Sequence, residues 1–278
     1  MSLGKTIAVA AVVNSASYVI WHATHRAECG VDIFDISVGQ PGGGVIYLVG
    51  GCLSRTAKPF RFVTDQIGQK IPADTSIHYI EYRNRGLNVA AARRAIKEHI
   101  DKHDYRQITF IAVSMGYQLI MGVARESDRV IGLNPCVGAL SLSPKMRRLV
   151  SALPAVAVIS AAFGWLIQLP IVKVDGPAYS PRLLLDQLAV CASSAHSKFG
   201  FRPDVLVVSI YDELVDNVAL QRLATQGERR RSVDGILTGK LKRPMELKEL
   251  PTDHFGVGEN HYRYAVIVPF LVDGSPAK

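Results

Sequence analysis

Residues 112–116 have the composition and spacing of a turn that presents a reactive serine. They read Ala-Val-Ser-Met-Gly, with Ser114 at the centre and a small residue two places to either side. Small residues are required where a strand reverses sharply into a helix, because the flanking backbones then approach closely. Such a turn would expose the Ser114 hydroxyl for attack on a carbonyl carbon. At average composition the pattern arises by chance in about one window per thousand, so an ordinary turn serine is the alternative and the surrounding chain has to decide.

A serine hydroxyl is a weak nucleophile at neutral pH, so a base must take its proton and a carboxylate must orient that base. We expect Asp212 to be the carboxylate because it directly follows the apolar run 205–211, with Glu213 and Asp216 as alternatives. We expect His254 to be the base, since it comes shortly after the strand-like segment 245–250. His261 competes with it. The remaining histidines precede or separate the key strands and suit surface or core positions: His22, His25, His78, His99, His103 and His196.

The charge that develops on the attacked oxygen needs preorganised hydrogen-bond donors. We expect one donor to be the backbone N–H of Met115. The other would come from the glycine-rich loop after residues 45–49, at Cys52 or Leu53. A cysteine such as Cys52 is more often a small buried residue than a second nucleophile. This chemistry requires no cofactor or metal, and the cysteines at positions 29, 52, 136 and 191 lack the spacing of a metal site or a disulfide framework.

The elements that must position these groups alternate between strands and helices. Strands are predicted for the apolar runs 45–49, 77–82, 108–113, 130–133, 205–211 and 245–250. The run before Ser114 is almost continuously apolar, which is typical of a strand buried on both faces of a parallel sheet. A helix is predicted over 117–127. Asn88 is expected to cap another helix, which carries Val89, Ala92, Ile96 and Ile100 on one face. The alternation from 45 to 138 indicates βαβ units, not a sandwich or a bundle.

In three features the chain resembles the α/β-hydrolase superfamily: Ser-Met-Gly at the turn, Asp-x-x-Val from Asp212, and a histidine before the last helix. The resemblance extends from roughly residue 31 to the C-terminus. It implies a mostly parallel central sheet flanked by helices, with the reacting groups at the carboxyl edge of the strands, where open α/β sheets bind ligands. Two residues depart from the usual pattern. Ala112 replaces a glycine at the turn, and Gly50-Gly51 stands where His-Gly is common.

The length of 278 residues, 48% of them hydrophobic, favours one α/β-hydrolase domain over 29–278 with a helical cap inserted at about 139–200. Residues 149–172 carry no charge. A stretch of this length could span a bilayer, which needs about 20 residues. A crossing there would, however, separate Ser114 from Asp212 and His254. We therefore expect an apolar cap that lines an acyl pocket or touches lipid, or alternatively a buried packing helix; the residues concerned are Phe163, Trp165, Leu166 and Ile167.

Residues 1–28 form a separate apolar segment that fits a signal, a membrane anchor or a docked helix. A signal or an anchor would make the protein exported or membrane-associated, and a docked helix would fit a cytoplasmic protein about equally well. The net charge is +8, with basic clusters at 145–148, 229–231 and 240–243. No basic motif interleaved with aromatic residues supports a nucleic-acid partner. The first cluster adjoins the apolar stretch, so contact with an anionic membrane surface is the better functional interpretation. A solvated positive face is the simpler one.

The sequence therefore predicts a serine hydrolase that cleaves a carboxylic ester or thioester of an apolar small-molecule or lipid acyl substrate through an acyl-enzyme intermediate. An amidase or peptidase that uses the same residues is the alternative within enzymes. A catalytically silent protein that binds a hydrophobic ligand in the same fold is the alternative from another class.

Overall fold

The computed structural model describes residues 29–52, 54, 71–152, 178–193, 203–209, 211–222 and 246–250, together with residues 12, 16, 169, 172 and 173. Its main feature is a seven-stranded sheet in the order β1-β3-β2-β4-β5-β8-β9. The strands are β1 (Val31–Ser37), β2 (Gly44–Val49), β3 (Ser76–Tyr82), β4 (Gln107–Val113), β5 (Arg129–Leu133), β8 (Val205–Ser209) and β9 (Glu246–Leu250).

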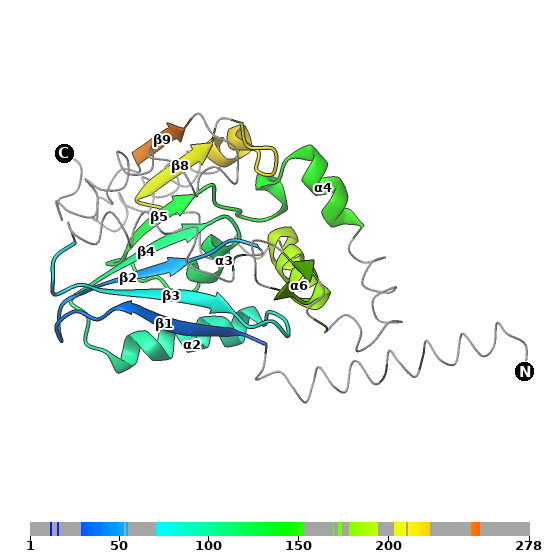
Figure 1. Ribbon diagram of the computed structural model, residues 1–278. Coiled ribbons are helices and arrows are strands. Elements are labelled where there is room, and N and C mark those ends of the chain that lie inside the picture. Colours follow the sequence, from blue (N-terminus) through cyan, green and yellow to red (C-terminus); the bar gives the residue numbers. More distant parts are fainter. Residues whose placement is uncertain are drawn as a thin grey trace, which may run out of the picture.

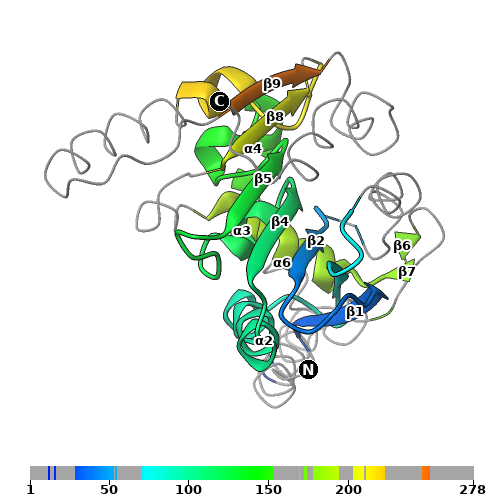
Figure 2. The same ribbon diagram turned by 90° about the vertical axis from the view of Figure 1, so that its left-hand side faces the viewer.

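Within this sheet, all neighbouring strands from β3 to β9 pair in parallel, and β1 pairs antiparallel with β3 at the edge. Figure 2 shows the strands in this order and the twist that accumulates between β9 and β1. The predicted mostly parallel α/β sheet is confirmed. Because parallel strands all end at one edge, the segments that follow β2, β4, β5, β8 and β9 begin on the same side of the molecule.

The described helices are α2 (Val89–Lys102), α3 (Gly116–Ile120), α4 (Pro144–Ser151) and α6 (Pro181–Ala192). A 3-10 turn, η4 (Ala139–Ser141), and a small two-stranded sheet of β6 (Val172–Lys173) and β7 (Ala178–Tyr179) accompany them. The cap of α2 is as predicted: the Asn88 side chain accepts a hydrogen bond from the Ala91 N–H at 3.1 Å. In Figure 1, α2 lies beside the β1 end of the sheet, and α4 and α6 lie beyond the arrowheads of the parallel strands.

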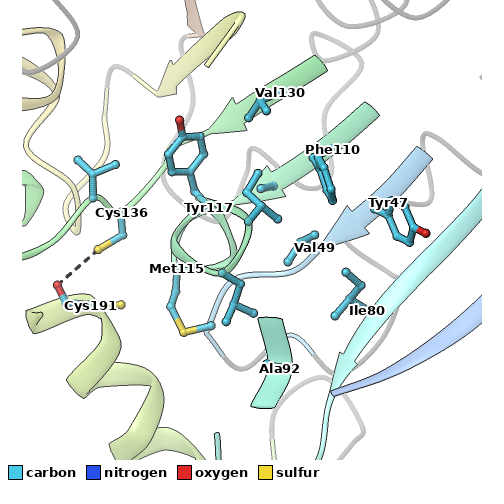
Figure 3. Packing of buried hydrophobic residues seen from close by; sticks show 14 of the residues in the cluster. Tyr47, Val49, Ile80, Ala92, Phe110, Met115, Tyr117, Val130, Cys136 and Cys191 are labelled. Atoms are coloured by element: carbon cyan, nitrogen blue, oxygen red, sulfur yellow. Dashed lines mark hydrogen bonds between the residues drawn. The ribbon is translucent and has the colours of Figure 1, made fainter. Parts of the chain in front are cut away.

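The core confirms that the central strands are buried on both faces. Every residue from 45 to 49 in β2 and from 108 to 112 in β4 is buried, so residues of both alternating sets avoid solvent. On one face, Tyr47 and Phe110 stack with ring centroids 5.4 Å apart. Helix α2 covers them with Ala92 and Ile96, which are fully buried (Figure 3).

Two predicted elements are shorter than expected, and the edge strand β1 was not predicted. The helix predicted over 117–127 ends at Ile120, and the Arg93 guanidinium from α2 binds the carbonyls of Gln118 and Leu119 in its last turn at 2.6 and 3.1 Å. The strand predicted over 205–211 ends at Ser209, and Tyr211 lies in an exposed turn. Strand β1 is mostly exposed along its length, so it lacks the continuous apolar run that marked the other strands.

Among the described residues no helix has the length and the hydropathy needed to cross a bilayer. The N-terminal segment, apart from residues 12 and 16, lies outside the described residues. The cap side chains Phe163, Trp165, Leu166 and Ile167 lie outside them as well, as do His254 and Leu53. The predictions made for these residues therefore stay predictions.

Candidate active site

Ser114 occupies the sharp turn between β4 and α3. Its backbone has φ +49°, in the left-handed region that residues other than glycine rarely adopt. Three backbone hydrogen bonds hold this conformation. The Ser114 N–H donates to the Leu133 carbonyl at 2.9 Å, and the Ser114 carbonyl accepts from the N–H groups of Tyr117 at 3.2 Å and Cys136 at 3.0 Å. Strain of this kind costs on the order of 1 kcal/mol and is typical of functional turns.

The end of β2 explains why the turn requires a glycine after the serine. A Cβ atom on Gly116 would lie 2.4 Å from the Gly50 carbonyl oxygen and 2.7 Å from the Val49 carbonyl oxygen. Both neighbours are backbone atoms of the adjacent strand end, so neither can rotate away. Ala112, on the other side of the serine, is fully buried, and its methyl group is accommodated. The substitution of alanine for glycine there is therefore compatible with the turn.

The loop after β2 packs directly against the serine. A Cβ atom on Gly51 would lie 3.0 Å from the Ser114 Cβ and 3.7 Å from its Oγ. The loop is held from behind, because the buried Tyr82 hydroxyl donates to the Gly50 carbonyl at 2.5 Å. Burial raises the pKa of Tyr82 well above its usual range, which keeps this hydroxyl protonated as a donor. Nothing in the sequence pattern of β3 marks the Tyr82 hydroxyl, so its contact with the loop was not predicted.

The backbone N–H groups of Met115 and Cys52 are the two described candidates for donors to a developing oxyanion. Met115 is fully buried directly after the serine, and Cys52 directly follows Gly51. In the part of the chain that the structure describes, no backbone hydrogen bond uses either N–H as its donor. Two N–H groups beside a serine turn are the kind of donor pair that a developing oxyanion needs. Leu53, the alternative to Cys52, lies outside the described residues.

Asp212 lies just beyond the carboxyl end of β8. Its Oδ1 accepts hydrogen bonds from the N–H groups of Leu214 and Val215, both at 2.8 Å, so the carboxylate is oriented by the turn that follows it. The two alternative acids have different environments. Asp216 accepts from the Ala219 N–H at 3.0 Å and so caps the next helical turn. The Glu213 carboxylate is exposed and faces Lys145 at 3.4 Å.

A buried asparagine joins the ends of β5 and β8. The Asn134 amide donates to the Ser209 Oγ and accepts from the Ser209 N–H, both at 2.7 Å. Asn134 also has a positive φ of +44°. Asparagine adopts that conformation more readily than most residues other than glycine, and an asparagine directly after a strand is the signal that sequence reasoning could have used. The pair fixes the spacing between the strand beside Ser114 and the strand that precedes Asp212.

Helix α6 packs across the same edge of the sheet. The Ser180 N–H at its start donates to the Asn84 side chain at 2.7 Å, and Asp186 accepts from the Leu87 N–H at 3.0 Å, so the helix is tied to the segment after β3. At its far end the Cys191 thiol lies 3.7 Å from the Cys52 thiol. In Figure 1, α6 accordingly faces the arrowheads of β2 and β3.

The cysteines beside α6 are packing residues. The Cys136 Sγ faces the Cys191 carbonyl at 3.7 Å, and both side chains are buried. Hydrogen bonding with Cys191 and burial raise the pKa of the Cys136 thiol well above its usual range. A protonated, buried thiol is a poor nucleophile, so neither Cys136 nor Cys191 competes with Ser114 for that role.

The structure thus brings Ser114, Met115 and the Gly51-Cys52 loop into one place and sets Asp212 on the same sheet edge, with β5 between β4 and β8. His254 follows β9 by four residues and lies outside the described residues. Within the described β9, Leu250 pairs with Ser209, so the chain leaves β9 at the edge where Asp212 lies.

No protein-family model matches this chain, and no curated protein matches its sequence. Solved structures do match its fold. The monoacylglycerol lipase of Paleococcus ferrophilus aligns with a TM-score of 0.58 at 16% identity, over 88% of this chain and 99% of that one. An α/β-hydrolase enzyme from a Medee basin deep-sea metagenome library gives 0.56 at 12% identity, over 89% and 96% of the two chains. A soluble variant of the Saccharomyces cerevisiae monoglyceride lipase gives 0.56 at 12% identity, over 89% and 92%. With a serine turn after β4 and this strand order, the chain has the α/β-hydrolase fold.

Proposed function

We propose that this protein is a serine hydrolase that cleaves a carboxylic ester or thioester of an apolar acyl group. One observation carries the proposal: Ser114 is held at φ +49° on a turn whose backbone abuts the Gly50-Gly51 loop. A strained serine at the carboxyl edge of a parallel sheet, beside two backbone N–H groups, is the arrangement that acyl transfer requires. A structural turn serine would need neither the strain nor the glycine loop.

In the proposed reaction, the Ser114 Oγ attacks the carbonyl carbon while His254 takes its proton. The Met115 and Cys52 N–H groups stabilise the resulting oxyanion. Its collapse breaks the bond to the alcohol or thiol, which leaves with the proton held by His254. A water molecule then attacks the acyl-enzyme with His254 again as base, and the carboxylic acid and free Ser114 are released. Asp212 holds the imidazole in the required tautomer throughout.

The choice of Asp212 among the acids rests on what the other carboxylates do. Asp216 is a helix cap and also faces Arg147 at 3.5 Å, while Glu213 points to solvent beside Lys145. Two backbone N–H groups donate hydrogen bonds to one oxygen of Asp212. These bonds fix the orientation of the carboxylate, as is required if it is to orient an imidazole.

The choice of His254 is compatible with the strand order. Three strand spacings of about 4.8 Å separate β4 from β9, or roughly 14 Å. The four residues from Leu250 to position 254 span at most about 14 Å when extended, and an imidazole side chain adds to this reach. A histidine at position 254 is therefore close enough along the chain to meet Ser114.

The solved structures that share this fold include the Paleococcus ferrophilus monoacylglycerol lipase, carboxylesterases of Nitrososphaera gargenis and a thioesterase domain from the curacin biosynthetic pathway. Each is an ester or thioester hydrolase by name, which supports the same reaction class here. We assign the apolar acyl pocket to the cap residues Phe163, Trp165, Leu166 and Ile167. Peripheral contact with an anionic membrane is a further part of the proposal. Two residues of this basic cluster, Lys145 and Arg147, already pair with acidic side chains, which reduces the charge available to attract an anionic surface.

A fluorophosphonate probe tests the proposal directly, because it labels only an activated serine. We expect the wild type to be labelled and Ser114→Ala to be unlabelled, with Ser141→Ala, another buried serine, as a matched control that keeps its labelling. A panel of p-nitrophenyl esters from acetyl to palmitoyl then measures acyl preference. Absence of labelling in folded wild-type protein would support a silent binding protein. Turnover of anilides at the rate of esters would support an amidase.

A further inference from the structure

A second group of chemically able side chains lies away from Ser114, where β1, β3 and α2 meet. Asp35 and His78 are directly paired across β1 and β3, and Tyr47 on β2 continues the same row. His99 comes from the last turn of α2 and lies over this row. The rings of His78 and His99 are 4.8 Å apart between centroids in an edge-on arrangement. The proposed hydrolysis uses none of these residues.

We propose that Asp35, His78 and His99 form a binding site for a divalent first-row metal ion, with Zn²⁺ as the best fit. One carboxylate oxygen and one nitrogen from each ring lie within 4.8 Å of one another. Tetrahedral Zn²⁺ with bonds of about 2.0–2.2 Å places its ligand atoms roughly 3.3 Å apart. The Asp35 Oδ1 and the His78 Nδ1 are already 2.8 Å apart, so small side-chain rotations complete the site.

The surroundings of the three residues are those of a metal site. Each ring is fixed by a phenol: the Tyr105 hydroxyl bonds the His78 Nε2 at 2.9 Å, and the Tyr47 hydroxyl bonds the His99 Nδ1 at 2.8 Å. Partners of this kind set the tautomer and the orientation of ligating imidazoles. His78 is buried and His99 is partly buried, and burial favours the neutral imidazoles that metal ligands must be.

The site also has an entry path and an open coordination position. The His78 side chain is 5% exposed, whereas that of Asp35 is 59% exposed, so an ion and its remaining water ligands can approach from the Asp35 side. Two imidazoles and a carboxylate suit Zn²⁺ and its neighbours in the first row better than they suit Mg²⁺ or Ca²⁺, which prefer all-oxygen sites. A purely structural role for the Asp35–His78 pair does not require a second imidazole beside it.

The position of the site indicates what the ion does. His78 of β3 pairs with Tyr47 of β2, and Tyr47 pairs in turn with Phe110 of β4. Ser114 follows Phe110 by four residues, just after the end of β4. With about 3.3 Å per residue and two strand spacings of about 4.8 Å, the site lies roughly 16 Å from Ser114. An ion there ties the edge strand β1 and the end of α2 to the sheet and does not touch the reacting groups. We therefore infer a stabilising metal site.

The test uses untagged full-length protein freed of metal with a chelator. Titration with Zn²⁺ against a chromophoric chelator is expected to show one tight site, and Co²⁺ to give the visible absorption bands of a nitrogen and oxygen environment of low coordination number. Asp35→Asn and His99→Gln should each weaken Zn²⁺ binding at least about tenfold, and Tyr105→Phe about tenfold. Zn²⁺ should raise the melting temperature of the wild type and not that of Asp35→Asn.

His103→Gln is the matched control. The His103 ring lies 4.6 Å from that of His99 but is exposed and outside the three-residue group. The proposal is overturned if Zn²⁺ fails to bind. It is equally overturned if Asp35→Asn and His99→Gln bind as the wild type does, or if His103→Gln loses as much affinity as they do. Fluorophosphonate labelling of Ser114 should be the same with and without Zn²⁺. Absence of Zn²⁺ binding would therefore not affect the hydrolase proposal, and absence of labelling would not affect the metal-site proposal.

Discussion

Substitution of Gly116 by alanine tests whether the contact between the serine turn and the end of β2 is needed for catalysis. The added Cβ would lie 2.4 Å from the Gly50 carbonyl oxygen. Ordinary contact begins at about 3.4 Å, so the turn and the glycine loop must separate by about 1 Å. That loop carries the proposed Cys52 donor, and the turn carries Met115 and Ser114 itself.

The expected loss of activity exceeds the expected loss of stability. A misplacement of about 1 Å at reacting groups costs roughly 100-fold, or about 2.7 kcal/mol of barrier. Overpacking costs about 1–3 kcal/mol in the free energy of unfolding. Because Gly116 begins α3, alanine returns up to about 1 kcal/mol through its higher helix propensity. We therefore expect kcat/KM for a short p-nitrophenyl ester to fall about 100-fold in a protein that still folds.

Gly30→Ala is the control, because a Cβ there meets no atom within 4 Å. Circular dichroism and urea titration establish that both variants are folded before kcat/KM is compared. If folded Gly116→Ala retains kcat/KM within about threefold of the wild type, the close approach of Gly50 to the turn does not position the reacting groups, and the inferred oxyanion geometry is wrong.

Three further predictions concern single side chains. Tyr82→Phe removes the donor to the buried Gly50 carbonyl, so the free energy of unfolding in urea should fall by about 1–3 kcal/mol; an unchanged value would mean that the loop is held otherwise. Asp212→Ala should lower kcat by roughly 10³–10⁴-fold, whereas Asp216→Ala should cost about 1 kcal/mol of stability through loss of a helix cap and leave kcat nearly unchanged. The reverse order would assign the catalytic acid to Asp216. Burial lowers the pKa of His99 to about 4, so between that value and about 6.5 the unfolded chain binds a proton that the folded chain does not, and stability falls as the pH falls. After discounting for partial exposure, chelator-treated protein should lose about 1 kcal/mol between pH 7 and pH 5 through His99. An equal loss in His99→Gln would refute this cause.

The local features that the sequence predicted best are those that depend on neighbouring residues in the chain. The strands of the parallel sheet were predictable because burial on both faces requires continuous apolar runs, and the start of α2 because Asn88 is a strong cap. The position of Ser114 on the turn follows from small residues at fixed spacing. Asp212 was proposed as the acid from its place after the apolar run 205–211, and it lies three residues beyond the end of β8.

The features that were missed depend on contacts between distant segments. The last carbonyls of helix α3 are bound by Arg93, more than twenty residues before them in the chain. The Tyr82 hydroxyl binds the glycine loop, and the Asn134 amide joins the segments after β5 to the end of β8; the apolar patterns of the strands predict neither contact. The grouping of His78, His99 and Asp35 required the register of β1 on β3 and the packing of α2, which no local spacing encodes.

The order of strands also has a consequence during protein synthesis. Beyond β4, the sheet grows in the order in which its strands leave the ribosome, but β5 and β8 are separated by 71 residues, from 134 to 204. At a translation rate of about 5–20 residues per second, the edge of β5 stays unpaired for roughly 4–14 s until β8 has been synthesised. During that interval the nascent chain exposes the unpaired edge of β5, which includes Val130, Ile131 and Leu133. Such an edge can pair with a strand of another chain. Chaperone capture of arrested chains that stop before residue 205 should therefore exceed capture of chains that extend past residue 250.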